Sequence, residues 1–287
     1  MFKKVITFCV LSIFSFQVKA QVMDAFVHEG EFGIGVGAGH YFGDLTAGMK
    51  LIDIKPKLSA TIFFRKQFNN YIGIKIAGTF AFLGYADKYT SYKDNLVKKN
   101  RNLSFNTNIW ELSINGEFNF FRFQPGFSEY RFTPYVSLGI GAFAYDPYAY
   151  LYGAKHYLRP LGTEGQQDKV NYPNLKPYSN MAMCFPIGFG LKYSLSEKIN
   201  IYGEMVYRLT NTDYIDDVSG NYAPDAFPPN PNGTPSVAYS LQDRSYEYGL
   251  PIGIKGRQRG NSKQADSYIT TQIGISINIG SYRCPKY

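Results

Sequence analysis

The sequence has few charges, few cysteines and, after its first twenty residues, no apolar run long enough to form a membrane helix. Only 18 % of its 287 residues are charged, whereas 17 % are aromatic. So many aromatic side chains exclude a disordered chain. The mean hydropathy of −0.24 and the lack of a mature apolar stretch of ~18 residues argue against a helical membrane protein. A composition with 28 glycines, 25 tyrosines and 23 phenylalanines is typical of β-barrels.

The first twenty residues have the pattern of an export signal. Lys3 and Lys4 precede an apolar stretch over residues 5–16, and Val18-Lys19-Ala20 places small residues at the −3 and −1 positions of a cleavage site. This pattern predicts a cleaved signal peptide at 1–20 and export through the Sec pathway. The alternative, a membrane anchor, is disfavoured because the apolar stretch is too short to span a bilayer. Residues 21–287 then form a single domain.

The net charge and the cysteine content restrict the classes of binding partner and of metal site that the sequence predicts. Removing Lys3, Lys4 and Lys19 lowers the net charge from +8 to +5, a mild excess that does not point to nucleic acid in an exported protein. Outer-membrane lipid and lipopolysaccharide are the better partner class. Cys184 and Cys284 remain after cleavage; the sequence leaves open whether they pair, and their spacing matches no zinc site.

The mature chain alternates apolar and polar residues in eight segments. In the clearest one, Trp110, Leu112 and Ile114 share one face, and Glu111 and Ser113 share the other. A period of two indicates a strand with one apolar face, and each segment reaches the ~9–11 residues that a tilted membrane crossing needs. The predicted strands lie near 31–42, 57–68, 71–85, 103–121, 132–145, 181–195, 199–210 and 266–280.

The connections between these strands alternate between long and short. Because outer-membrane barrels place short turns at the periplasmic end and long loops outside, this alternation favours such a barrel. The sequence therefore predicts an all-β fold, an eight-stranded antiparallel transmembrane up-and-down β-barrel, in the outer membrane of a Gram-negative bacterium. The alternative is a soluble, lipocalin-like barrel whose apolar face points inward, since periodicity alone does not distinguish the two.

Charged residues lie on the face predicted to line the barrel. An eight-stranded barrel has an interior just wide enough to be filled by side chains, and unpaired charges there would be costly. We therefore predict a network of ion pairs that keeps the barrel shut; a proton or ion path is the alternative. With Lys57 the set has five positive and three negative members, the others being Arg65, Lys75, Glu111, Glu117, Lys192, Glu204 and Arg208.

The sequence offers little for catalysis, and we expect no enzyme activity and no cofactor. His28, His40 and His156 show no spacing to a serine and a polar orienting group that would define a hydrolase. The segment 213–217 carries three carboxylates in five residues. Such a segment could hold Ca²⁺ through oxygen ligands, but local turn formation by aspartate is the favoured interpretation, so no metal site is predicted.

Three stretches resemble a known family. Gly33-x-Gly35-x-Gly37 is followed by Tyr41-x-Gly43-Asp44-Leu45, the segment 213–219 reads Asp-Tyr-Ile-Asp-Asp-Val-Ser, and Arg259-Gly260-Asn261-Ser262 precedes Asp266-Ser267-Tyr268. This combination resembles the PorG-like outer-membrane β-barrel proteins of the type IX secretion system in Bacteroidota. The aspartate-rich segment is its specific part, whereas a glycine-rich strand is common to many barrels.

The resemblance implies a non-enzymatic structural or assembly component of a protein secretion and gliding apparatus. Its partners would be periplasmic ring proteins of that apparatus, and the tail 281–287 is one candidate contact. The alternatives are an outer-membrane adhesin or lipopolysaccharide-binding barrel and, less favoured, a lipid-modifying enzyme. The candidate partner-binding or structural residues are Asp213, Tyr214, Asp216, Asp217, Arg259 and Asp266.

Overall fold

The structure is a computed structural model that describes residues 30–46, 55–89 and 96–279. The predicted signal peptide, Cys284 and the tail 281–287 lie outside the described residues. Eight long strands form the body of the molecule: β1 (Gly30–Phe42), β2 (Lys57–Gln67), β3 (Ile72–Ala86), β4 (Ser104–Asn119), β5 (Phe132–Ala144), β8 (Met181–Ser194), β9 (Ile199–Thr210) and β10 (Ser267–Ile279).

These strands close into an antiparallel barrel. Each is paired with its neighbour in the chain, β1 pairs with β10, and a pairing between β3 and β4 completes the ring. The ends of the strands fall within two residues of the predicted ends. The register brings like residues together, for example Ile34 opposite Ile62 on one side and Ile275 on the other. The prediction of a closed eight-stranded barrel is confirmed.

The apolar face of every strand points outward. The exposed fraction of the side chain is 67 % for Ile62, 65 % for Trp110 and 70 % for Ile273, whereas Ser59 and Asn119 on the opposite face are fully buried. Water-soluble proteins do not expose apolar patches of this extent. The soluble alternative, with its apolar face inward, is therefore wrong, and the exterior is that of a barrel surrounded by lipid.

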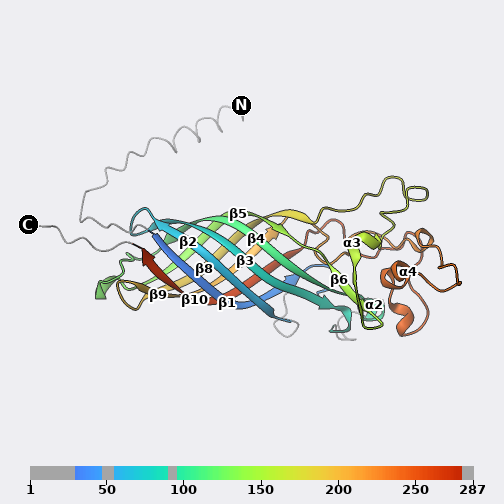
Figure 1. The fold of residues 1–287 in the computed structure, drawn as a ribbon, viewed down its shortest axis with the longest axis horizontal. Helices are drawn as coiled ribbons and strands as arrows, with labels where there is room; N and C mark the ends of the chain where they lie inside the picture. The colour runs from blue at the N-terminus through green and yellow to red at the C-terminus, as the bar shows by residue number, and fades with distance from the viewer. Residues whose placement is uncertain (1–29, 47–54, 90–95, 280–287) are drawn as a thin grey trace, which may run out of the picture.

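The connections divide the barrel into two different ends (Figure 1). Residues 68–71, 120–131 and 195–198 make the short connections, and β1 begins and β10 ends on that side. In the tightest of them, the side chain of Asn69 accepts hydrogen bonds from the backbone N–H groups of Tyr71 and Ile72, both at 2.8 Å. The described residues of the connections 43–56, 87–103, 145–180 and 211–266 lie at the opposite end, as predicted.

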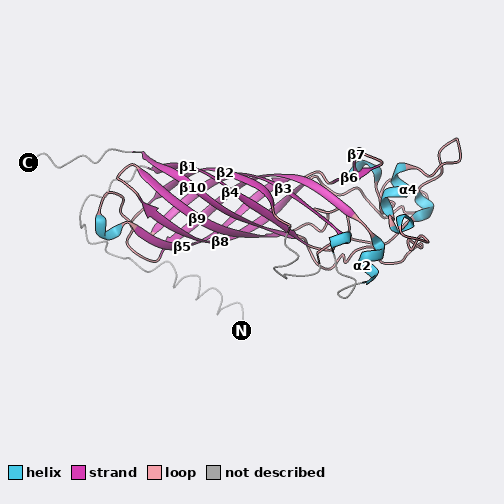
Figure 2. Ribbon diagram, turned by 90° about the horizontal axis from the view of Figure 1, so that it is seen from below, coloured by secondary structure: helices cyan, strands magenta, loops and turns pink. Residues whose placement is uncertain are grey.

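The long connections fold together into a cap, which we call the loop cap (Figure 2). A hairpin of β6 (Tyr148–Leu151) and β7 (Ala154–Tyr157) joins short helices there. The sequence did not predict these elements, because each is only three to six residues long and too short to show a period. The helices are η2 (Asp87–Tyr89), α2 (Leu96–Arg101), α3 (Leu158–Leu161), η4 (Pro224–Ala226), α4 (Val237–Gln242) and η5 (Ser245–Glu247); η3 (Ser128–Tyr130) lies in a short connection.

The larger apolar core lies where the loop cap meets the barrel. It joins strand residues such as Tyr41 and Phe105 to Ile215, Val218 and Leu241 of the long connections. The loop cap is therefore packed on the barrel rather than extended into solvent. Within the described ranges, no helix is long and apolar enough to cross a membrane.

Candidate functional site

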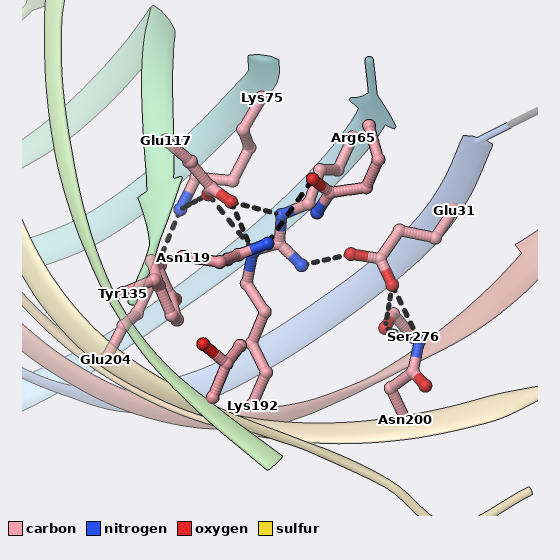
Figure 3. Close-up of polar contacts among 12 residues, drawn as sticks. Glu31, Arg65, Lys75, Glu117, Asn119, Tyr135, Lys192, Asn200, Glu204 and Ser276 are labelled. Carbon is pink, nitrogen blue, oxygen red and sulfur yellow. Dashed lines mark hydrogen bonds and ion pairs between the residues drawn. The ribbon is translucent and has the colours of Figure 1, made fainter. Parts of the chain in front are cut away.

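A network of buried charges fills the end of the lumen that is nearer the short connections (Figure 3). Glu117 of β4 lies at its centre. Its carboxylate contacts three cations: Arg65 Nε at 2.7 Å, Lys192 Nζ at 2.6 Å and Lys75 Nζ at 3.5 Å. These four residues come from four different strands, so the network connects opposite walls of the barrel.

Two further carboxylates complete the network. Arg65 also pairs with Glu31, whose other oxygen accepts hydrogen bonds from Asn200 and Ser276, both at 2.8 Å. Glu204 takes a hydrogen bond from Lys75 at 2.6 Å and another from the Tyr135 hydroxyl at 2.8 Å. Because these charges are paired and hydrogen-bonded, their burial is compensated.

A separate ion pair lies closer to the loop cap. Arg208 Nε is 2.8 Å from Glu111, and the Tyr268 hydroxyl donates to the same carboxylate oxygen at 2.7 Å. Arg208 also donates to the hydroxyl of Thr270. Seven of the eight predicted lumen residues thus lie in two clusters, one around Glu117 and one around Glu111.

The predicted charge count of this lumen needs correction. Glu31 was not among the expected inward charges, although it shares the face of Gly33 and Gly35 by the same period of two. Lys57, which was counted, lies half-buried at the rim and donates to Asn106 at 2.5 Å. The lumen therefore holds four acidic and four basic side chains in place of three and five.

Aromatic rings fill the remaining space around the charges. Phe63 and Tyr202 meet edge to face, with their ring centres 5.2 Å apart. A Cβ at Gly33 would lie 2.2 Å from the Phe63 ring, and one at Gly35 would lie 2.2 Å from the Tyr202 hydroxyl. The glycines of β1 therefore make room for rings that project from the other walls, and side chains fill this part of the lumen.

The loop cap is held by a second set of buried polar residues. The hydroxyl of Tyr41 on β1 donates to Asp216, and it lies 2.9 Å from Asp266. Asp266 also accepts the backbone N–H of Ile215, and Asp216 accepts that of Val218, each at 2.9 Å. This pair of carboxyls fastens the aspartate-rich segment to the first strand and to the start of the last.

Arg259 and Asp217 form the centre of the loop cap. Arg259 pairs with Glu164 at 3.0 Å and lies 3.6 Å from Asp217. The Tyr178 hydroxyl donates to Asp217 at 2.7 Å, and Thr163 donates to its other oxygen. Asp217 adopts a φ of 67°, a left-handed conformation that aspartate tolerates better than most residues. Arg259, a candidate partner-binding or structural residue by sequence, is thus buried.

Five of the six candidate partner-binding or structural residues make contacts that hold the loop cap together. The exception is Asp213. Tyr214 stacks on Tyr178 with ring centres 4.4 Å apart. Asp216 and Asp217 turn toward different partners, as described above. In the described part of the chain, no three metal-ligating side chains converge. His40 lies on β1 and accepts the backbone N–H of Lys55 at 3.2 Å, whereas His156 lies on β7, so these two histidines do not share a site.

Four buried or half-buried carboxyls of the loop cap, those of Asp213, Asp216, Asp217 and Asp266, have raised pKa values. Burial raises the pKa of Asp213 to about 7 and that of Asp217 to about 6. Burial also raises the pKa values of Asp216 and Asp266 well above the usual range, and the charge of each neighbouring aspartate adds to the rise. Loss of water around a carboxylate disfavours its charged form, so this cluster binds protons at mildly acidic pH.

We expect Arg259→Lys to loosen the loop cap by about 1–2 kcal/mol, because lysine keeps the charge but loses the planar fork that serves several acceptors. Hydrogen exchange of residues 158–166 and 214–220 should report the opening. Lys263→Ala, at an exposed position of the same connection, is the matched control. Equal protection in Arg259→Lys and the wild type would contradict this role.

The fold and the two polar clusters define a closed β-barrel with an apolar exterior, a charge-paired lumen and an ordered loop cap. A family model matches residues 3–226 of the chain, and the chain belongs to that family, DUF6089, described as a domain of unknown function. No curated protein matches the chain.

Solved structures with some similarity are bacterial surface barrels. Neisserial surface protein A (NspA) is 8 % identical with a TM-score of 0.42, and each chain is well covered, 87 % of this one and 97 % of that one. The attachment invasion locus protein Ail of Yersinia pestis, in complex with the heparin analogue sucrose octasulfate, is 12 % identical with a TM-score of 0.39 over 87 % and 97 %. The outer-membrane enzyme PagL is 10 % identical with a TM-score of 0.30 over 87 % and 99 %. At these scores, the fold assignment rests on the strand pairing of this chain itself.

Proposed function

We propose that this chain is a non-enzymatic outer-membrane barrel that serves as a structural and assembly component of a type IX secretion and gliding apparatus. The observation that carries the proposal is the closed lumen. Glu117 and the cations around it fill the barrel interior, and the loop cap covers its other end. A barrel whose interior is filled in this way has no open pore, so we assign its function to its outer surfaces.

The outer-membrane placement is supported by the exterior of the barrel. Isoleucine, leucine and phenylalanine side chains are 40–70 % exposed along the outward positions of most strands, and strands of 11–16 residues exceed the ~9–11 that a crossing needs. The short connections then face the periplasm and the loop cap faces outside.

The type IX assignment is supported by the three resembling stretches, and their placement directs where partners should bind. Asp216, Asp217, Arg259 and Asp266 are buried and hold the loop cap together. They are therefore unsuited to contact a ring of periplasmic proteins. We assign that contact to the short connections, where Tyr71, Arg122 and Tyr130 line a cleft of about 580 Å³.

Two tagged forms of the full chain test this assignment. A tag inserted after Gly233, an exposed position with no atom near its Cβ site, leaves the short connections untouched, whereas a tag after Gly126 obstructs them. We expect mild-detergent purification through Gly233 to recover periplasmic ring components, and purification through Gly126 to lose them. Heat-modifiable migration on gels establishes that both forms are folded.

Two results would contradict the proposal. One is recovery of the barrel alone through Gly233 from membranes that contain the ring. The other is normal export of secreted cargo after deletion of the gene. A change in the lipid A or phospholipid mass spectrum on overexpression would instead support the lipid-modifying alternative.

A further inference from the structure

A basic cleft opens where β2, β3 and β4 meet the loop cap. We call it the rim cleft and define it by six of its lining residues. It has a volume of about 530 Å³. Four cations from three parts of the chain converge on it, together with the exposed rings of Tyr89 and Tyr150. The six defining residues are Lys55, Lys57, Gly84, Lys88, Asn106 and Arg244.

Among the described residues, few acidic groups compensate the positive charge of the rim cleft. Lys55 and Lys88 approach the face of the Tyr89 ring at 5.1 Å and 5.6 Å, and Lys57 donates to the neutral Asn106. Among the residues that the structure describes, none of these three lysines has a carboxylate within 4 Å. The fourth cation, Arg244, has an acidic partner in this part of the structure, Glu247 at 2.7 Å.

Gly84 shapes the floor of the rim cleft. A Cβ at this position would lie 2.5 Å from Lys57 Nζ and 2.8 Å from Asn106 Oδ1. The absence of a side chain therefore lets the Lys57 ammonium group lie against the strand beside Asn106. The two groups present hydrogen-bond donors together at the edge of the barrel.

The position of the rim cleft relative to the apolar exterior indicates its ligand. Phe80, Phe82 and Gly84 are successive outward positions of β3, so the cleft begins ~7 Å beyond the last of these rings. Trp110 packs beside Phe80 with ring centres 4.5 Å apart. Aromatic residues of this kind mark the boundary between hydrocarbon and headgroups, which places the cleft at headgroup level.

We propose that the rim cleft binds a phosphate group on the headgroup of an outer-leaflet glycolipid, the lipid A part of lipopolysaccharide. Ammonium and guanidinium groups form strong, charge-assisted hydrogen bonds with phosphate, and the lipid's acyl chains would lie along the apolar exterior below the cleft. The proposal rests on the outer-membrane placement with the loop cap outward.

The other basic cleft of the loop cap does not offer the same chemistry. It has a volume of about 280 Å³, and Arg101 and Arg259 line it. Arg101 is already held by Asp87 at 2.7 Å, and Arg259 by Glu164 at 3.0 Å. These two arginines therefore serve the fold. Lys98 and Arg257 also line this cleft, together with the acidic side chain of Asp44, whereas no acidic side chain is among the described residues that line the rim cleft.

The test compares two forms of one lipid with the full-length mature protein, purified in detergent. The probes are diphosphoryl lipid A and the same lipid after enzymatic removal of both phosphates. We expect the double variant Lys55→Met/Lys88→Met to raise the Kd for diphosphoryl lipid A by about tenfold and to leave the Kd for the dephosphorylated lipid unchanged. Lys57→Met, which removes a third lining cation, should weaken phosphate-dependent binding in the same way.

The matched control is Lys176→Met/Lys263→Met, which removes two exposed lysines from other parts of the long connections. Equal Kd values for the two lipids would overturn the proposal, as would an equal loss in the control. Full competition by inorganic phosphate, or a preference for a soluble sulfated polysaccharide, would also overturn it, since each would show that the lipid is not required. Failure of the folded protein to insert into lipid bilayers would instead count against the outer-membrane placement itself.

Discussion

Replacing Glu117 with alanine is expected to destabilise the barrel by about 3–5 kcal/mol, the cost of leaving buried cations without their partner. Glu117 is shared by Arg65, Lys75 and Lys192. Lys192 depends on it most, because its other polar contact is the neutral side chain of Asn119 at 3.2 Å. Urea unfolding of the protein in lipid vesicles, followed by gel migration and tryptophan fluorescence, measures the loss.

A second variant separates the charge from the volume of the side chain. The double variant Glu117→Gln/Lys192→Met removes one acid and one base, so the lumen keeps equal numbers of each. Arg65 then still has Glu31, and Lys75 still has Glu204. We expect the double variant to be closer to the wild type than Glu117→Gln alone, and this coupling is measured by the double-mutant cycle.

The control for this series is Glu197→Ala in the exposed turn between β8 and β9, which should change the stability by no more than about 0.5 kcal/mol. If Glu117→Ala were equally harmless, the lumen network would be irrelevant to stability. A rise in ion conductance without loss of stability would instead favour the alternative of an ion path.

Raising the pH from 5 to 8 is expected to loosen the loop cap. The pKa values of Asp213 and Asp217 are raised to about 7 and about 6 from a usual value of 3.8, chiefly by burial. A carboxyl whose pKa is higher in the folded than in the unfolded state stabilises the fold below the unfolded value and loses that contribution as the pH passes the folded value. For the buried Asp217, the rise from 3.8 to about 6 corresponds to a contribution on the order of 3 kcal/mol, of which about half is lost above pH 5.

The effect is measured by hydrogen-exchange protection factors of residues 211–266 at the two pH values. The barrel strands, which are held by the sheet, serve as the internal reference. Protection in the loop cap should fall as the pH rises, and protection in β4 and β5 should not. Constant protection of the loop cap from pH 5 to 8 would show that its carboxyls do not carry protons in the folded state.

Asp216→Asn should reduce this pH dependence. The single hydroxyl hydrogen of Tyr41 lies between Asp216 and Asp266, so it satisfies only one carboxylate fully. An amide at position 216 supplies the missing hydrogen and cannot ionise. We expect its loop cap to be about tenfold better protected than the wild type at pH 8, the effect of about one additional satisfied hydrogen bond. Asp216→Leu, which lacks both polar atoms, should open at either pH.

The barrel could be predicted because the patterns that specify its strands lie within short stretches of sequence. Alternation such as Trp110-Glu111-Leu112 identifies both the strand and its two faces, and the lengths of the connections identify the two ends. Glu31 follows the same alternation but was not predicted as an inward charge. It stands at the very start of the alternating pattern, where an acidic residue resembles the end of a strand. The inward charges were thus predictable, and their pairing across the lumen was not.

The loop cap could not be predicted, because its contacts join residues far apart in the chain. Tyr41 meets Asp216 across 175 positions, and Arg101 donates to the backbone oxygen of Arg259 across 158. Neither pairing follows from the spacing of nearby residues. A run of aspartates and a basic loop both resemble solvent-exposed surface in the sequence, and only the fold shows that Asp217 and Arg259 are buried side by side.

The hydrogen bonds of Tyr41 make packing of the loop cap depend on closure of the barrel. Tyr41 belongs to the first strand, and Asp266 immediately precedes the last, so their hydrogen bond in the loop cap spans the seam between β1 and β10. The loop cap therefore cannot be completed before the seam is closed. If barrel folding stops with that seam open, the long loops stay unpacked and accessible to proteases. The contacts of Tyr41 therefore make an incompletely inserted chain more susceptible to degradation.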